Sequence, residues 1–367
     1  MRVKLNFFVF LFVGLMNLVD VFAMSKELNQ NRVFVESLMP QGYVKDGSVD
    51  YTDIIQKILN KYNHVVFPNF PILINCVGLK VKSNSVLEFQ ENSLLKLKAS
   101  DKHTYNILEI HSVQKVKILN VKIKGDLDTH IGKDGEHGMG ISIRSSKDVE
   151  VVNAKIEDCW GDGIYIGRLN RYDRNGMFVP SENIIIRDAY LNRNRRNAIS
   201  ITAGRNILID KLEANNTKGT FPMAGIDIEP NSNKDYLEGI LLKNIVTNSN
   251  RYGIQLCLKK MVGERQRKVD IRIEGHKDER SHIGFRIDKF DRKGKPLNGL
   301  IEVKNTIWSN NKNGHLSFAG DQSGSCQIIF SNVLGKKNGV ISNEVFRNES
   351  GKNPTLKSIQ KKVVFKK

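Results

Sequence analysis

The sequence predicts an all-β solenoid, a parallel β-helix with a short N-terminal capping helix. A small residue repeatedly precedes a short strand of alternating apolar residues, as in Gly163-Ile-Tyr-Ile and Gly225-Ile-Asp-Ile. Seven such strands, beginning at residue 107, start 23 to 35 residues apart. Each unit carries two further short strands, so about 23 residues complete one coil and longer units carry loops. A β-sandwich is the alternative, but its hairpins would not reproduce this registration.

The N-terminus reads as a secretory signal peptide. Residues 7–19 are almost wholly apolar, and Val21-Phe22-Ala23 offers permissive residues for cleavage. This stretch is shorter than the ~20 residues that span a bilayer, so we expect cleavage after Ala23 and no stable membrane span. The mature protein is then expected to be secreted or periplasmic. An uncleaved anchor is the alternative.

The rest of the chain divides into three parts. Residues 24–43 form a polar lead-in, residues 44–340 the β-helix domain, and residues 341–367 a basic tail or cap. Acidic and hydroxyl residues precede an amphipathic segment at 51–61, which predicts a helix that caps the N-terminal edge of the strands. From Leu79 onward, period-two strands separated by turn residues continue nearly to the end.

Composition indicates a basic protein with no metal or disulfide framework. There are 57 Lys and Arg against 39 Asp and Glu, a net charge of +18 that becomes +17 when residues 1–23 are removed. Such charge favours polyanions such as acidic glycans, although lysines that merely solvate the surface are an equal alternative. No nucleic-acid module is present, so no nucleic-acid partner is expected. The four cysteines are too widely spaced for a zinc site.

Registration of the repeats brings a set of carboxylates onto one outer face. The first outward column there reads Glu109, Ser142, Tyr165, Ser200, Asp227, Gln255 and Arg286, and the second reads His111, Arg144, Gly167, Thr202, Glu229, Cys257 and Asp288. Asp227 and Glu229 are two apart on a strand, with backbones about 6.5 Å apart, a distance that suits an acid and base pair for glycoside hydrolysis. Asp162, two coils away, is a third candidate, although Gly-Asp-Gly is also ordinary turn chemistry. The alternative for the pair is a solvated face or ion pairs with neighbouring arginines.

The same surface offers candidate substrate-binding residues. Arg195 and Arg196 could clamp a carboxylate or sulfate, or alternatively form salt bridges across coils. Trp160 and Tyr165 offer flat faces for sugar rings, with packing of Trp160 beneath the loop 168–182 as its alternative. His137 lies in the turn column beside them.

The loop at 125–137 raises the question of Ca²⁺. Asp126, Asp128, Asp134 and Glu136 are potential ligands, but their order does not match an EF-hand loop. We therefore favour solvation of the loop and expect no cofactor. Recurrent asparagines are typical of turn ladders rather than ligands; they are Asn153, Asn183, Asn206 and Asn244.

Residues 44–340 resemble the pectate-lyase-like superfamily. The segment Lys45-Asp-Gly-Ser-Val-Asp-Tyr-Thr-Asp-Ile-Ile-Gln-Lys57 before Val65-Val-Phe-Pro68 looks like its N-terminal signature. Three further segments are similar to glycan-active bacterial β-helix proteins: Cys159–Gly167, Asn194–Ile201 and Ala224–Pro230. The resemblance implies a right-handed parallel β-helix that acts on polysaccharides as a hydrolase, lyase or epimerase. Neither the paired-Asp motif of polygalacturonases nor a calcium-lined lyase site is plainly present.

These observations together predict a secreted, monomeric glycoside hydrolase that cleaves an acidic polysaccharide. Hydrolysis ranks above elimination because carboxylates outnumber candidate Lys and Tyr bases on the predicted face. A polysaccharide lyase of the same fold is the second hypothesis, and a non-catalytic glycan-binding or structural solenoid is the third.

Overall fold

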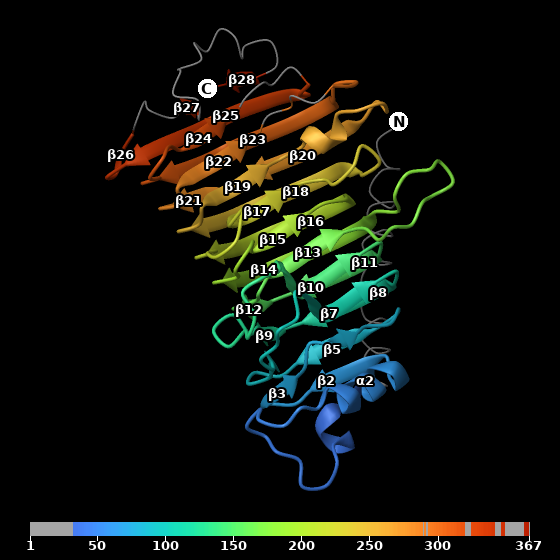
Figure 1. Cartoon of the computed structure of the whole chain (residues 1–367). Helices are drawn as coiled ribbons and strands as arrows, with labels where there is room; N and C mark the ends of the chain where they lie inside the picture. The colour runs from blue at the N-terminus through green and yellow to red at the C-terminus, as the bar shows by residue number, and fades with distance from the viewer. Residues whose placement is uncertain are drawn as a thin grey trace, which may run out of the picture.

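The computed structural model describes residues 32–288, 290, 293–319, 324–341, 346–348 and 363–366. The chain winds into a right-handed parallel β-helix, as predicted (Figure 1). The expected signal peptide lies outside the described residues, as do the start of the lead-in and most of the segment 341–367. Strand pairs are parallel throughout the described sheets except β25 with β26, which excludes a β-sandwich.

The strands form two sheets. The ten-stranded sheet contains β4 (Leu79–Lys80), β7 (Thr104–His111), β10 (His137–Arg144), β13 (Ile164–Gly167), β15 (Ile199–Ile201), β17 (Ala224–Ile228), β19 (Tyr252–Leu256), β22 (Ile283–Ile287), β24 (Leu316–Phe318) and β27 (Phe346–Asn348). The larger sheet contains β1 (Arg32–Phe34), β2 (His64–Phe67), β3 (Pro71–Ile74), β5 (Val86–Phe89), β6 (Leu94–Leu97), β8 (Gln114–Leu119), β9 (Lys122–Lys124), β11 (Lys147–Val152), β12 (Lys155–Glu157), β14 (Ser181–Asn192), β16 (Gly204–Asn215), β18 (Leu237–Asn248), β20 (Lys268–Glu274), β21 (Lys277–Glu279), β23 (Asn298–Ser309), β25 (Gln327–Lys337), β26 (Val340–Ile341) and β28 (Val363–Lys366).

Helices are short, and one of them closes the N-terminal end. The α-helix α2 (Thr52–Lys61) begins where the Asp50 side chain accepts hydrogen bonds from the backbone N–H and hydroxyl of Thr52. Ile55, Ile58 and Leu59 are buried on one face of the helix, which packs against the first coils as the sequence predicts. Two 3-10 turns also lie within the described residues: η1 (Val35–Leu38) and η2 (Lys259–Met261).

Aliphatic side chains stack in register through the interior. Ile184 of β14 lies over Ile207 of β16, which in turn lies over Ile240 of β18. All three are buried, because alternate residues of each strand point into the narrow interior. Small residues occur where coils approach closely: a Cβ on Gly225 would lie 2.6 Å from the carbonyl oxygen of Gly253.

Each coil bends sharply at a residue in the left-handed conformation. Between β11 and β12 this residue is Asn153, with φ of 54°, and its amide donates to Asn120 of the preceding coil at 2.9 Å. Asn183 donates to Asp148, Asn206 to Asn183, and Asn244 to Asp210, which confirms the predicted side-chain ladders. Asparagine tolerates positive φ because its short side chain bonds locally, so the bend repeats at low cost.

Replacement of Ile207 by Ala should lower the free energy of unfolding by roughly 2–5 kcal/mol, because it leaves a cavity inside a packed stack. The matched control is Val246→Ala, an outward-facing residue that is 41% exposed. Chemical denaturation of both variants measures the difference. Equal losses in the two variants would contradict the inward registration.

Candidate functional site

The outer face of the ten-stranded sheet carries the polar column that the sequence predicts. Tyr165 pairs with Ser200, Ser200 with Asp227, and Asp227 with Gln255 in the strand register. The column continues to Arg286, because Gln255 pairs with it in turn. The backbone N–H of Glu229 bonds to Ile201 at 3.1 Å, so Glu229 continues the same ladder just beyond β17.

Asp227 lies in a protected environment on this face. It is 1% exposed, and its carboxylate accepts hydrogen bonds from Gln255 at 3.0 Å and from Asn197 at 3.4 Å. Burial, and after it the neighbouring Glu229, raise the pKa of Asp227 against the opposing effect of Arg196, and the net result is a pKa of about 7. Asp227 is therefore positioned to hold a proton near neutral pH.

Arg196 joins the carboxylates around it. Its guanidinium lies 3.1 Å from Asp162, 3.7 Å from Glu136 and 3.9 Å from Glu229. Burial alone would lower the pKa of Arg196, but these carboxylates raise it, so the cation persists. The buried Nε of Arg196 has no hydrogen-bond partner within the described part of the chain.

The three candidate carboxylates differ in accessibility. The Glu229 side chain is 26% exposed, whereas the Asp162 side chain is fully buried. Asp162 accepts hydrogen bonds from Arg196 and from the backbone of Asn197, and burial raises its pKa against the effect of Arg196. The assisting role of Asp162 stays a prediction: in this structure its buried side chain holds Arg196 from beneath, as the turn position of Gly-Asp-Gly permits.

Trp160 does not offer a free face to a sugar. It is 7% exposed, with the ring of His130 stacked 3.7 Å away and the guanidinium of Arg195 lying 3.9 Å from its centroid. The packing comes from the loop 125–137 rather than from 168–182. Arg195 is occupied with that loop, since it donates to the carbonyls of Gly135 and Lys133. The roles of Trp160 and Arg195 in contacting substrate stay predictions, and in this structure both side chains anchor the loop 125–137.

His137 and Tyr165 remain accessible. His137 is 48% exposed and lies 3.6 Å from Glu136, which places it beside the Arg196 cluster. The hydroxyl of Tyr165 lies 2.8 Å from that of Thr202, and the Arg144 guanidinium lies 4.3 Å from the Tyr165 ring centroid.

A cavity of about 280 Å³ opens beside Tyr165. It is lined by Arg144, Tyr165, Arg168, Leu169, Asn170 and Asn231. Arg168 pairs with Asp235 at 3.1 Å, whereas no carboxylate of the described residues pairs with Arg144. Sequence reasoning placed Arg144 in the second outer column but did not single it out. The feature of the sequence that could have pointed to Arg144 is its neighbour in the next coil, Tyr165.

The acidic loop residues do not converge on a metal. Asp126 binds His130 at 2.8 Å and the hydroxyl of Tyr105, while Asp128 pairs with Arg193 at 2.7 Å. Over the described residues, no group of three or more His, Cys, Asp or Glu side chains is arranged to hold a metal ion. In the same part of the chain, no helix has the length and apolar character needed to cross a membrane.

Three solved structures share this fold. An iota-carrageenase complexed to iota-carrageenan fragments is 12% identical, with a TM-score of 0.64 over 87% of this chain and 91% of that chain. The mannuronan C-5 epimerase AlgE6 A-module of Azotobacter vinelandii is 13% identical, with a TM-score of 0.59 over 82% and 86%. A tailspike capsular polysaccharide depolymerase of Acinetobacter baumannii bacteriophage Fri1 is 13% identical, with a TM-score of 0.58 over 83% and 59%. Likeness at these identities shows the fold.

Two curated proteins of Bacillus subtilis strain 168 are similar in sequence. The uncharacterized protein YclG is 28% identical over 260 residues, which are 60% of this chain and 44% of that protein. The SPbeta prophage-derived protein YorA is 29% identical over 163 residues, 41% of this chain and 28% of that protein. The matched regions span less than half of either relative. No family model matches the chain.

The raised pKa of Asp227 predicts a specific pH dependence of stability. The folded state binds this proton up to about pH 7, whereas the unfolded state releases it near 3.8, so the contribution favours folding at low pH and is lost as pH rises through that window. Asp227→Asn keeps the neutral form. The unfolding midpoint of the variant relative to wild type should therefore increase from pH 4 to pH 8 in thermal scans. A constant difference would contradict the assignment.

Proposed function

We propose that this chain is a carbohydrate-active enzyme that hydrolyses glycosidic bonds of an acidic polysaccharide on the outer face of its ten-stranded sheet. One observation carries the proposal: two carboxylates in unequal surroundings, Asp227 and Glu229, lie two residues apart beside Arg196. Unequal surroundings allow one carboxyl group to hold a proton while the other stays ionised. The fold shared with a carrageenase, an epimerase and a depolymerase tailspike supports the glycan class.

The environments suggest how the two roles divide. Asp227 would donate its proton to the leaving glycosidic oxygen, while Glu229 would take a proton from the water that attacks the anomeric carbon. The C–O bond breaks as the water oxygen bonds to that carbon, so one water is consumed for each cleavage. In the free protein Asp227 bonds to Gln255 and Asn197, and acid catalysts commonly complete their contact with substrate only in the complex.

The cavity beside Tyr165 favours an anionic substrate. Arg144 presents a guanidinium there without a paired carboxylate among the described residues, and its planar fork suits a carboxylate or sulfate. Tyr165, for which a role as a sugar platform stays a prediction, lines the same cavity. The overall charge of +18 would attract a polyanion to this surface.

The apolar N-terminal segment supports a second element of the proposal, export from the cytoplasm. A soluble extracellular glycan would then be accessible to the enzyme. Mass analysis of the protein recovered outside cells should give a chain that begins at Met24, whereas an intact N-terminus on that material would contradict cleavage after Ala23.

Removal of either carboxylate tests the catalytic assignment. Glu229→Gln and Asp227→Asn should each lower kcat about 10²- to 10⁴-fold, because each removes one proton-transfer group, while binding of the polysaccharide persists. New reducing ends, followed on a panel of sulfated, uronate-containing and neutral polysaccharides, measure turnover. Asp270→Asn, on the outer face of the larger sheet, is the matched control.

The same panel separates the alternatives. Reducing ends without absorbance from unsaturated uronates support hydrolysis, and both signals together indicate a lyase. Full turnover in both carboxylate variants would overturn the assignment. Glycan binding without any turnover would identify a non-catalytic solenoid.

Substitution of Arg144 by Ala tests the anionic subsite. Loss of a charge-assisted hydrogen bond should raise KM for an acidic polysaccharide about ten- to a hundred-fold and leave kcat nearly unchanged. The salt dependence of KM should also weaken, because a screened charge contact is gone. Kinetics at low and high ionic strength measure both effects. An unchanged KM at low salt would show that Arg144 does not contact the substrate.

A further inference from the structure

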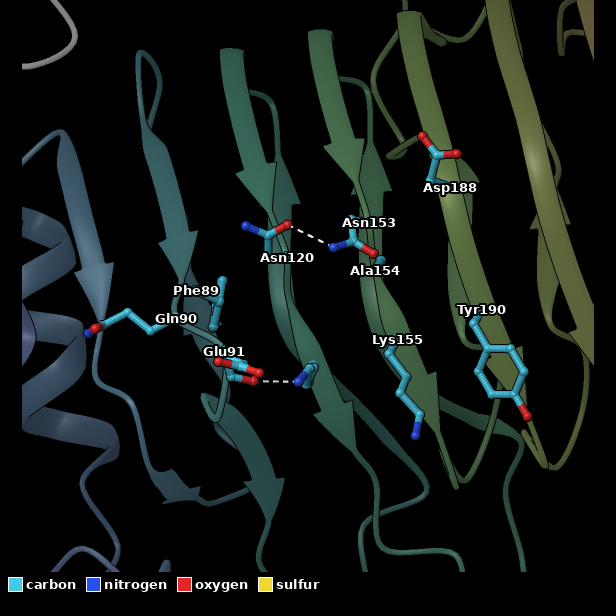
Figure 2. Close-up of a pocket in the computed structure, with 10 residues that line it drawn as sticks. Phe89, Gln90, Glu91, Asn120, Asn153, Ala154, Lys155, Asp188 and Tyr190 are labelled. Carbon is cyan, nitrogen blue, oxygen red and sulfur yellow. Dashed lines mark hydrogen bonds between the residues drawn. The ribbon is translucent and has the colours of Figure 1, made fainter.

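The larger sheet holds a second cavity, separate from the site described above. Its volume is about 450 Å³, within the range of small-ligand pockets, and every strand that lines it belongs to the larger sheet. Figure 2 shows how its walls are built from successive coils, with Asn120, Asn153 and Asp188 in one row and Lys155 and Tyr190 in the next. None of its lining residues is shared with the cavity beside Tyr165.

The bends of the coils create this cavity. Asn120, Asn153 and Asp188 have φ angles of 61°, 54° and 51°, so the backbone turns sharply at the same position in three consecutive coils. Strands β9, β12 and the second half of β14 then continue at an angle to the strands before them. The register places Lys155 between Lys122 and Tyr190, so their side chains project from neighbouring coils along one wall.

The lining offers both hydrogen-bond donors and hydrogen-bond acceptors. The Asn120 amide accepts from Asn153 at 2.9 Å, which leaves the Asn120 NH₂ and the Asn153 carbonyl oxygen without partners among the described residues. Lys122 donates to the backbone carbonyl of Glu91. The Tyr190 hydroxyl has no hydrogen-bond partner in the described chain, and its ring is half-buried.

Side chains of both positive and negative charge line this cavity. Lys122 and Lys155 line the cavity together with the carboxylates of Glu91 and Asp188. Lys155 is paired with Glu157 at 2.9 Å, and Asp188 with Lys211 at 3.5 Å. A lining with balanced charge gives an anion no electrostatic advantage. It does suit a ring with many hydroxyl groups, which both donates and accepts, while the Tyr190 ring supplies an apolar face.

We propose that this cavity is a second, non-catalytic glycan-binding site that takes an uncharged, hydroxyl-rich sugar residue of the polysaccharide. The glycan class rests on the proposed function, but the site would operate whether or not the chain is an enzyme. It would retain the protein on the polymer through the larger sheet, while the carboxylate pair engages the polymer from the ten-stranded sheet.

Retention in native gels cast with polysaccharide tests the proposal. The probe is a neutral galactan, compared with a gel that lacks polysaccharide and with a gel cast with alginate, in which every residue is charged. Tyr190→Ala should reduce the retardation at least several-fold, and Tyr190→Phe should preserve most of it because the ring remains. Glu213→Ala, which occupies the same outward row one coil further along and lies outside the cavity, is the matched control. Thermal unfolding confirms that the variants are folded.

Cleavage of a short oligosaccharide separates this proposal from the proposed function. Tyr190→Ala should leave that turnover unchanged while it weakens retention on the polymer. Retention equal to wild type in a folded Tyr190→Ala protein would overturn the second site, even if Glu229→Gln abolishes turnover. Conversely, weakened retention in a chain that cleaves nothing would support the second site and refute the catalytic proposal.

Discussion

The structure depends on stacking of one coil directly over the next. Parallel strands must keep a common register for their backbone groups to pair, and the narrow interior must be filled at every level. The stack of Ile184, Ile207 and Ile240 meets both requirements, because each side chain packs against its counterparts above and below. The bends at asparagines are the necessary complement, since without them the strands could not close a coil.

The same register determines what can happen on the outside. A residue that faces outward on one strand has its neighbours fixed by the coils on either side, so polar groups come together although they are far apart in the sequence. Asp227 lies next to Gln255 and Ser200 for this reason. The resulting polar surface is dense enough to bury Asp227, and burial together with Glu229 raises its pKa. Arg196 then forms ion pairs with three carboxylates, those of Glu136, Asp162 and Glu229.

Strand periodicity made the fold and the outer columns predictable, because a two-residue period assigns each side chain to one face. The column from Tyr165 to Gln255 has the predicted register. The loops were not predictable in this way. Nothing in the repeat indicates that the segment 125–137 folds back over Trp160, or that Asp162 is sealed beneath Arg196. Arg144 was visible in its column, but its significance depends on Arg168 and on a loop that follows β13.

The attachment of the loop 125–137 has a consequence for how such a protein can diverge. Arg195 holds this loop by donating hydrogen bonds to the backbone carbonyls of Lys133 and Gly135, and these bonds do not involve side chains of the loop. Main-chain atoms are the same for any amino acid, so substitutions at Lys133 and Asp134 would leave these two hydrogen bonds in place. The loop borders the Arg196 cluster through Glu136. Related chains could therefore differ in their side chains at the rim of the carboxylate site and still keep the hydrogen bonds that hold this loop in place.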